Sequence, residues 1–175
     1  LPELIINGKL DSYLVQPKNV LLSVMTSGTN TSAIGDLLYG LLLLCIFCFS
    51  VKRLLLFLLF TVTGAGIMTA FALLMGSLSF WFVRSELFAS HMVSSAVSFA
   101  TYPDGIFKGT ARFLLYNVIP VGMMIYHPVH IMIAFDAAKL FTVLGYLTLL
   151  SALAVFVFYW GLRRYTSSSL MAARM

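Results

Sequence analysis

Charged residues are scarce in this sequence, and their scarcity decides the class of protein. They make up 10% of the 175 residues, whereas hydrophobic residues make up 61%. A typical soluble domain has roughly 25% charged residues, so this composition excludes an ordinary water-soluble domain, which could not bury so much apolar surface. The net charge of +5 therefore indicates Lys and Arg at membrane edges, where they contact lipid phosphates, rather than nucleic-acid binding.

The sequence also has few cysteines and none of several common catalytic motifs. The two cysteines, Cys45 and Cys48, lie in an apolar run, where packing as small apolar side chains is favoured over redox or metal chemistry. No Walker, H-E-x-x-H or G-x-S-x-G motif occurs, so no ATP-hydrolysing motif is visible. His127 and His130 would share a helix face, and we expect an interfacial or helix-capping pair there rather than a metal site.

What the sequence does contain is a series of long runs without Asp, Glu, Lys or Arg. A helix needs roughly 20 apolar residues to cross a hydrocarbon core of about 30 Å, and at least two of the runs reach that length. The five runs are Leu37–Val51, Leu54–Val83, Leu87–Pro103, Phe113–Phe135 and Leu140–Leu162. The chain is therefore predicted to be an all-α polytopic membrane protein in contact with the lipid bilayer.

We predict four membrane-crossing helices and one re-entrant segment within a transmembrane domain of residues 34–165. The predicted spans are residues 34–50, 54–83, 87–101 and 140–162. Residues 106–135 are apolar but contain Pro120 and Pro128, which suits a hairpin of two short helices that enters the membrane and returns before the last span.

Two local features refine the predicted spans. Lys52-Arg53 is expected to form a tight polar turn between the first two spans. Residues 54–83 are too long for an upright span, so we expect them to tilt, protrude or bend near Gly64-Ala65-Gly66.

The residues before and after this domain are not spans. Residues 1–33 begin with a short amphipathic helix that turns at Asn7-Gly8 and stops before Pro17. Residues 166–175 are a polar tail. The chain opens on a polar, turn-rich segment without an initial Met, so we expect it to be a piece of a longer protein.

One face of the predicted helix 87–101 is polar. At about 100° per residue its hydroxyl-bearing residues and His91 fall within an arc of roughly 140°. The members of this polar arc are Ser90, His91, Ser94, Ser95, Ser98 and Thr101. Such residues line helix–helix contacts in membranes or a polar pathway, and both interpretations stay open for Ser90, Ser94 and Ser98. Leucine at Ala96 or Ala100, opposite the arc, is expected to be mild.

Several segments, taken in order, carry a family resemblance. Residues 5–17 contain the pattern G-x-L-D-x-x-L-x-x-P, and Ile-Gly-Asp-Leu-Leu-Tyr-Gly follows at 34–40. Tyr-Pro-Asp-Gly-Ile-Phe-Lys-Gly at 102–109, with Val-Ile-Pro-Val at 118–121 and Tyr-His-Pro at 126–128, precedes the last run, and Tyr-Trp-Gly-Leu-Arg-Arg-Tyr ends it at 159–165. This ordered set resembles the type-2 ATP-binding-cassette (ABC) exporter permeases of bacteria.

The resemblance implies a partner and a place in the cell. The four spans would be spans three to six of a six-span permease, in the bacterial cytoplasmic membrane, with the first two spans upstream. A second permease subunit, identical or different, would complete a dimer, and separate ABC ATPase subunits would hold ATP and Mg, leaving no cofactor on this chain. Residues 1–33 would be a cytoplasmic coupling helix and connector, and residues 166–175 a cytoplasmic tail. The implied contacts with the ATPase are Glu3, Gly8, Lys9, Leu10, Asp11, Tyr13, Leu14 and Pro17.

The same resemblance also helps to assign the membrane orientation of the loops and the function of the chain. The cations divide almost equally between the two predicted sides, so the assignment of Lys9 to the cytoplasm and of Lys52 and Lys108 to the outside depends on the family. A permease subunit is preferred over two alternatives, a structural subunit of a larger membrane complex and an intramembrane enzyme that uses His residues. The amphipathic segment before Pro17 favours the permease, because a passive bundle needs no docking element.

Overall fold

A computed structural model of the protein describes residues 1–26, 32–47, 49–82 and 85–165. Within these ranges the chain is all-helical, as predicted. The elements are α1 (Pro2–Ile6), α2 (Asp11–Leu14), α3 (Val20–Met25), α4 (Ser32–Phe47), α5 (Val51–Ser77), η1 (Leu78–Phe80), α6 (Ser85–Ala100), η2 (Asp104–Ile106), α7 (Gly109–Asn117), η3 (Gly122–Tyr126), α8 (His127–Ile133) and α9 (Ala137–Leu162). Cys48, Arg84 and the predicted tail 166–175 lie outside the described residues.

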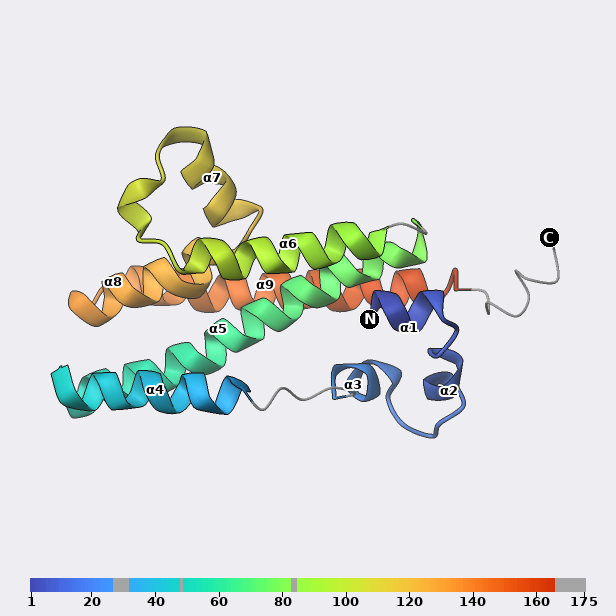
Figure 1. Cartoon of the computed structure of the whole chain (residues 1–175), viewed down its shortest axis with the longest axis horizontal. Helices are drawn as coiled ribbons and strands as arrows, with labels where there is room; N and C mark the ends of the chain where they lie inside the picture. The colour runs from blue at the N-terminus through green and yellow to red at the C-terminus, as the bar shows by residue number, and fades with distance from the viewer. Residues whose placement is uncertain (27–31, 48, 83–84, 166–175) are drawn as a thin grey trace.

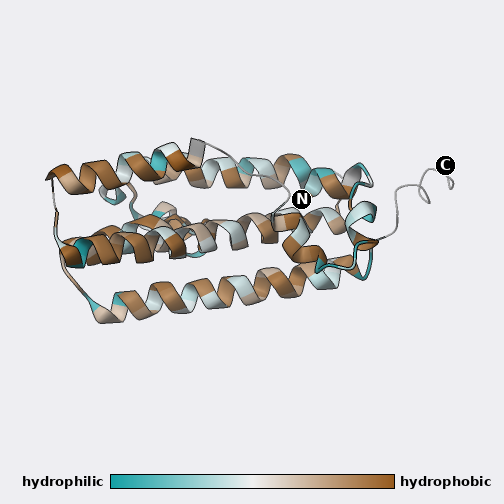
Figure 2. Ribbon diagram, turned by 90° about the horizontal axis from the view of Figure 1, so that it is seen from below, coloured by the Kyte–Doolittle hydropathy of each residue, from teal (hydrophilic) through white to brown (hydrophobic). Residues whose placement is uncertain are grey.

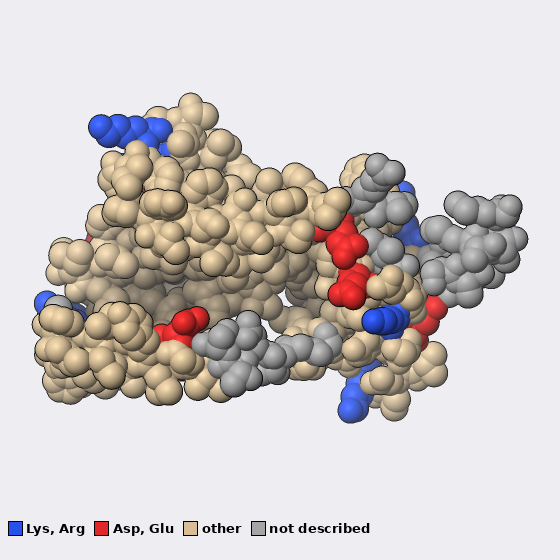
Figure 3. Space-filling view, in the orientation of Figure 1, with Lys and Arg blue, Asp and Glu red and all other residues tan. Residues whose placement is uncertain are grey.

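The helices α4, α5, α6 and α9 form an elongated bundle and alternate in direction along the chain (Figure 1). The short helices α1–α3 lie at the end where α9 finishes, and α8 lies towards the other end, with α7 projecting from the side of the bundle (Figure 1). Hydrophobic residues dominate the long helices (Figure 2). Charged side chains leave a broad uncharged band over α6 (Figure 3), which is the distribution that a membrane-embedded bundle requires.

Among the described residues, two helical stretches are long and apolar enough to cross a membrane, Val51–Phe80 and Ala137–Leu162. The helices α4 and α6 have 16 residues each, which corresponds to about 24 Å at 1.5 Å per residue and is shorter than a hydrocarbon core of about 30 Å. The structure thus supports an all-helical membrane protein, while the count of four crossings stays a prediction.

The core of the bundle is the contact between α5 and α9. Ile67 of α5 and Val143, Ala154 and Phe158 of α9 have no exposed surface. Two glycines allow close approach: a Cβ at Gly66 of α5 would lie 2.9 Å from Leu147 Cδ1 of α9, and a Cβ at Gly161 of α9 would run into the ring of Phe80 in η1, the turn that continues α5. Close approach of this kind is how helices gain packing energy in lipid, where burial of apolar surface supplies little.

One expectation about α5 is corrected by its bounds, and of the three alternatives for its length the bend near residues 64–66 is excluded. Lys52 and Arg53 do not form a turn, because α5 already begins at Val51 and both lie in its first helical turn. Lys52 Nζ instead lies 4.5 Å from the centre of the Phe135 ring, a cation–π contact that stabilises a cation at this end. The helix is also unbroken through residues 64–66, where the glycines serve close packing, so its length is accommodated by an oblique course through the bundle (Figure 1).

Residues 106–135 form two separate helical pieces, as their prolines predicted. The first is α7, and after Pro120 the chain enters the π-helical turn η3, which continues into α8. Pro128 lies in the first turn of α8 and has no N–H to donate to the carbonyl of Met124. The regular series of backbone hydrogen bonds is therefore interrupted here, next to the wider π-helical turn η3. Entry of these pieces into the membrane stays a prediction.

The α5–α9 contact generates a prediction with a matched control on the same helix. Gly161→Leu should destabilise the protein by about 1–3 kcal/mol, because the new side chain displaces Phe80. Gly145→Leu should be nearly neutral, because nothing lies within 4 Å of a Cβ at Gly145. Thermal melting in detergent tests this, and equal melting temperatures for the two variants would contradict the assigned interface.

Candidate functional site

The N-terminal segment, residues 1–26, folds by a short-range pattern that matches its sequence. The helix α1 ends at Ile6, and Gly8 adopts a φ of 67°, a left-handed conformation that glycine reaches without strain. The Leu10 N–H then donates to the Leu4 carbonyl over 2.9 Å. The helix α2 ends at Leu14, so the predicted turn at Asn7-Gly8 and the stop before Pro17 are confirmed.

A hydrophobic cluster fastens this segment to the end of the bundle. Leu10 has no exposed surface, and Ile5 and Val24 are buried beside it. Their apolar neighbours include Phe80, which directly follows α5, and Leu162, the last residue of α9. The segment is thereby held at the ends of the two longest helices, with α1 lying alongside the bundle near that end (Figure 1).

This packing changes the expected use of the segment's apolar face. We expected that face to fill a groove on another subunit, but Leu10 is enclosed by the chain itself and offers no surface. Among the predicted contact residues, Glu3, Lys9, Leu14 and Pro17 are exposed, whereas Gly8, Asp11 and Tyr13 are partly buried. The surface available to another protein is therefore polar and mixed, with Leu14 as its largest predicted apolar contact.

Tyr165 closes the cluster beneath α2. Burial, together with the neighbouring Asp11 carboxylate, raises the pKa of Tyr165 to about 12. The phenol therefore keeps its proton at any physiological pH, and the Tyr165 ring packs edge-on against Phe80 with centroids 6.1 Å apart. Asp11, one of the predicted contact residues, thus lies near enough to Tyr165, which follows the end of α9, to affect the pKa of its phenol.

A concave surface of about 510 Å³ adjoins the exposed side of this segment. Its walls come from α2, the residues that follow it, α3 and the C-cap of α3; the lining residues are Tyr13, Gln16, Lys18, Asn19, Leu22, Ser23 and Thr26. Asn19 caps α3 by accepting the Leu21 N–H over 3.0 Å, and the Tyr159 hydroxyl donates to the same oxygen over 3.2 Å. A hydrogen bond therefore joins the wall of the hollow to α9.

The polar arc of α6 points away from the bundle. Ser90, Ser94 and Ser98 are exposed, and the hydroxyls of Ser90 and Ser98 donate to carbonyls of their own helix over 2.9 Å. The opposite face packs on α5, and there Ala96 has no exposed surface. The expectation that leucine at Ala96 would be mild is therefore wrong, because a larger side chain has no room there.

Ser90 and Ser94 also line a groove of about 360 Å³ between α1, α5 and α6. Glu3 and Glu86 stand at this groove, and Figure 3 shows acidic side chains together where α6 begins. The small pair Ala72 and Gly76 forms another part of it. A Cβ at Gly76 would lie 3.3 Å from Pro2, so the small residue lets α1 lie against α5. The polar arc thus begins beside the N-terminal segment.

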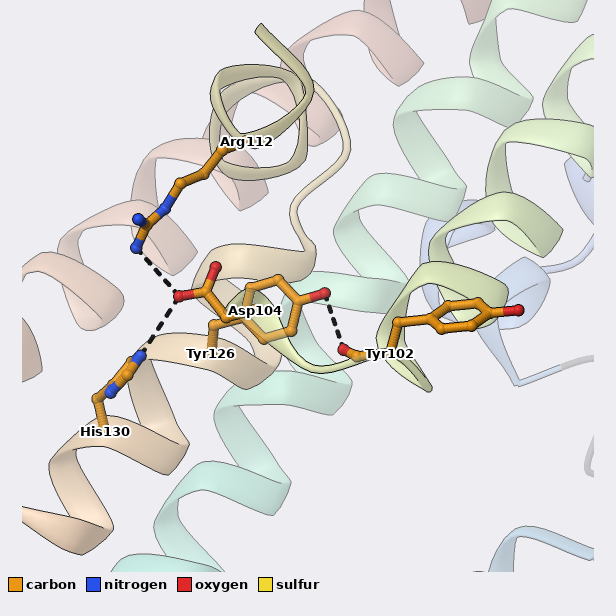
Figure 4. A network of polar contacts seen from close by, with 5 residues as sticks. All are labelled: Tyr102, Asp104, Arg112, Tyr126 and His130. Atoms are coloured by element: carbon orange, nitrogen blue, oxygen red, sulfur yellow. Dashed lines mark hydrogen bonds and ion pairs between the residues drawn. The ribbon is translucent and has the colours of Figure 1, made fainter. Parts of the chain in front are cut away.

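Sequence reasoning missed a polar network around Asp104 at the other end of the bundle. Its Oδ2 accepts a hydrogen bond from Arg112 Nη2 over 3.0 Å and lies 3.4 Å from His130 Nε2 (Figure 4). The Tyr126 hydroxyl lies 3.1 Å from the carbonyl oxygens of Phe99 and Tyr102 and donates to one at a time. Asp104 and His130 are 26 residues apart, so no local pattern could have paired them.

The hydrophobic cluster of the N-terminal segment generates a second prediction. Leu10→Ala should loosen residues 1–17 from the bundle, because truncating a fully buried leucine costs about 2–5 kcal/mol. Hydrogen exchange of these residues should then accelerate by at least about tenfold. Leu14→Ala, at a side chain that is 40% exposed, is the control and should leave exchange within about twofold. Equal acceleration by both variants would argue against the cluster as the anchor.

Comparison with known proteins adds one finding. The model of the family described as ABC-2 family transporter protein matches residues 1–169, which is nearly the whole chain and includes both the N-terminal segment and all the long helices. No curated protein and no solved structure matches the chain.

Proposed function

This chain belongs to the ABC-2 family of transporter proteins, and on that premise we propose that it is the permease subunit of an ABC exporter. In this proposal the chain is a multi-pass protein of the bacterial cytoplasmic membrane. It pairs with a second permease subunit, identical or different, and ATP is bound and hydrolysed with Mg by a separate ABC ATPase. The family match over residues 1–169 is the observation that carries it.

The absence of catalytic motifs from the sequence fits a division of labour between subunits. A permease supplies a route through the membrane and needs no reacting side chain, whereas phosphoryl transfer needs a phosphate-binding loop and metal ligands. The apolar helices α5 and α9 suit the first role. The sequence has no Walker motif for the second, so we assign ATP hydrolysis to a partner.

The N-terminal segment is the surface that we assign to the ATPase. Lys9, Leu14 and Pro17 are exposed there, and the adjoining hollow of about 510 Å³ can receive a side chain from the partner. Because Leu10 packs against the ends of α5 and α9, displacement of this segment is transmitted to those helices. Closely packed contacts transmit strain rather than absorb it.

The polar arc of α6 is the surface that we assign to the route or to the second permease subunit. Ser90, Ser94 and Ser98 are exposed, and hydroxyls gain partners from water or from another protein that lipid cannot offer. Ser90 and Ser94 also line the groove beside Glu3. A substrate that entered along this arc would thus pass close to the segment that senses the ATPase.

The proposed ATPase contact is tested by a double substitution on the exposed side of the segment. Lys9→Glu with Leu14→Ser should weaken co-purification with the ATPase at least about tenfold, because it reverses a charge and removes the apolar contact while leaving the Leu10 cluster intact. Lys108→Glu, at the far end of the bundle, should have no effect. Undiminished co-purification of the double variant would refute the assigned surface.

The polar arc is tested by thiol labelling, in the assembled complex and in a background without Cys45 and Cys48. Ser94→Cys and Ser98→Cys should react with a membrane-impermeant maleimide at least about tenfold faster than Leu149→Cys, because the reactive thiolate forms in water and not in lipid. Leu149 is the control because it is 70% exposed in the middle of α9. Similar slow rates, without cross-linking between permease subunits, would mean that the arc faces lipid.

A further inference from the structure

A second cavity lies at the end of the bundle away from the N-terminal segment and has no part in the proposed coupling. It measures about 510 Å³ and is formed by α7, α8 and the first turn of α9. The polar residues around it are Arg112, Tyr116, His127, His130 and Lys139. It is bounded by Gly109, the first residue of α7, and by Phe113.

The described wall of this cavity carries hydrogen-bond donors and no carboxylate. The carboxylates that pair with its cations are not among the lining residues: Asp104 contacts Arg112 and His130, and Asp136 Oδ2 lies 3.4 Å from Lys139 Nζ. Arg112 has five N–H donors and Lys139 has three. Each can therefore keep its carboxylate partner and still offer donors to a ligand in the cavity.

The guanidinium of Arg112 is held in place before any ligand arrives. Asp104 orients it from one side (Figure 4), and its carbon lies 5.5 Å from the centre of the Tyr116 ring. Tyr116 in turn meets the His127 ring edge-on, with centroids 5.2 Å apart. A donor fixed in this way loses little freedom on binding, which favours affinity.

One atom at the cavity lacks a partner among the described residues. His127 Nδ1 is buried without a hydrogen bond, and His127 is part of the cavity wall. Leaving a buried polar atom unsatisfied is unfavourable, and Asp104 Oδ1 is likewise buried without a partner. Neither atom has surface open to the cavity, so the charged donors that a ligand can reach are those of Arg112 and Lys139, which are exposed in the cavity wall. The same wall has no capping side chain at the start of α7, where free backbone N–H groups favour negative charge.

We infer that this cavity binds a phosphate ester. A phosphate group offers several acceptor oxygens around one centre, which suits donors that converge from three helices, and arginine binds such oxygens in pairs. The ester could belong to an anionic lipid headgroup or to a small molecule in solution. Arg112 shares α7 with exposed apolar side chains, Phe113 at 63% and Leu114 at 44% exposed, and this apolar surface can contact the acyl chain of a lipid.

Calorimetric titration of the detergent-solubilised full chain tests this inference with two probes. The first is a short-chain phosphatidylglycerol and the second is inorganic phosphate, in a maltoside detergent that contains no phosphate. Arg112→Gln with Lys139→Gln should weaken binding of the active probe by at least about tenfold, because two charged contacts are lost. Lys108→Gln should change it less than about twofold, because Lys108 is an exposed neighbour that does not line the cavity.

The outcomes separate the two sources. Binding of the lipid alone assigns a headgroup site, binding of inorganic phosphate alone assigns a soluble ester, and binding of both assigns the shared group. Lys139→Gln alone is the control for a folding defect in the double variant, because it leaves the contacts of Asp104 with Arg112 and His130 intact. This single variant should still weaken binding. No binding of either probe, or equal losses in the Lys108→Gln control, would overturn the inference. The result does not depend on whether the chain couples to an ATPase.

Discussion

The packing of α5 against α9 is the contact on which the rest of the structure depends. Ile67 of α5 and Val143 and Phe158 of α9 have no exposed surface within the core that these two helices share with their neighbours. In lipid, apolar burial supplies little drive for association, so two helices hold together through the closeness of their contact. Gly66 and Gly161 allow that closeness by removing the side chains that would collide with Leu147 and Phe80.

Both ends of the bundle to which we assign a function pack against this pair of helices. At one end, Leu10 and its neighbours pack on Phe80 and Leu162, where the two helices finish. At the other, a Cβ at Gly64 of α5 would lie 3.4 Å from the Met124 carbonyl of η3, so α5 also supports the segment that carries His127 and His130. A movement imposed on the N-terminal segment thus has a continuous packed route along the molecule, which is the mechanical property that the proposed coupling requires.

The features that local chemistry dictates were predictable, and those that need a distant partner were not. Glycine after asparagine predicted the turn at Gly8, and Pro120 predicted the break between α7 and η3, because each acts on its own backbone. The predicted turn at Lys52-Arg53 was wrong because two adjacent charges were interpreted as the end of a helix. Lysine and arginine both favour helices, and here they lie in the first turn of α5. The burial of Leu10 was missed because amphipathicity shows that a face is apolar but not what covers it.

The sequence by itself determined that this chain is a helical membrane protein and which family it resembles, since both follow from composition, run length and short ordered motifs. Only the tertiary structure decided that the apolar face of the N-terminal segment is used internally, that the polar arc of α6 points outwards, and that Asp104 meets His130 across 26 residues. The physical reason is that helical periodicity and turn chemistry act within a few residues, whereas the partner of each face depends on how the helices pack against one another.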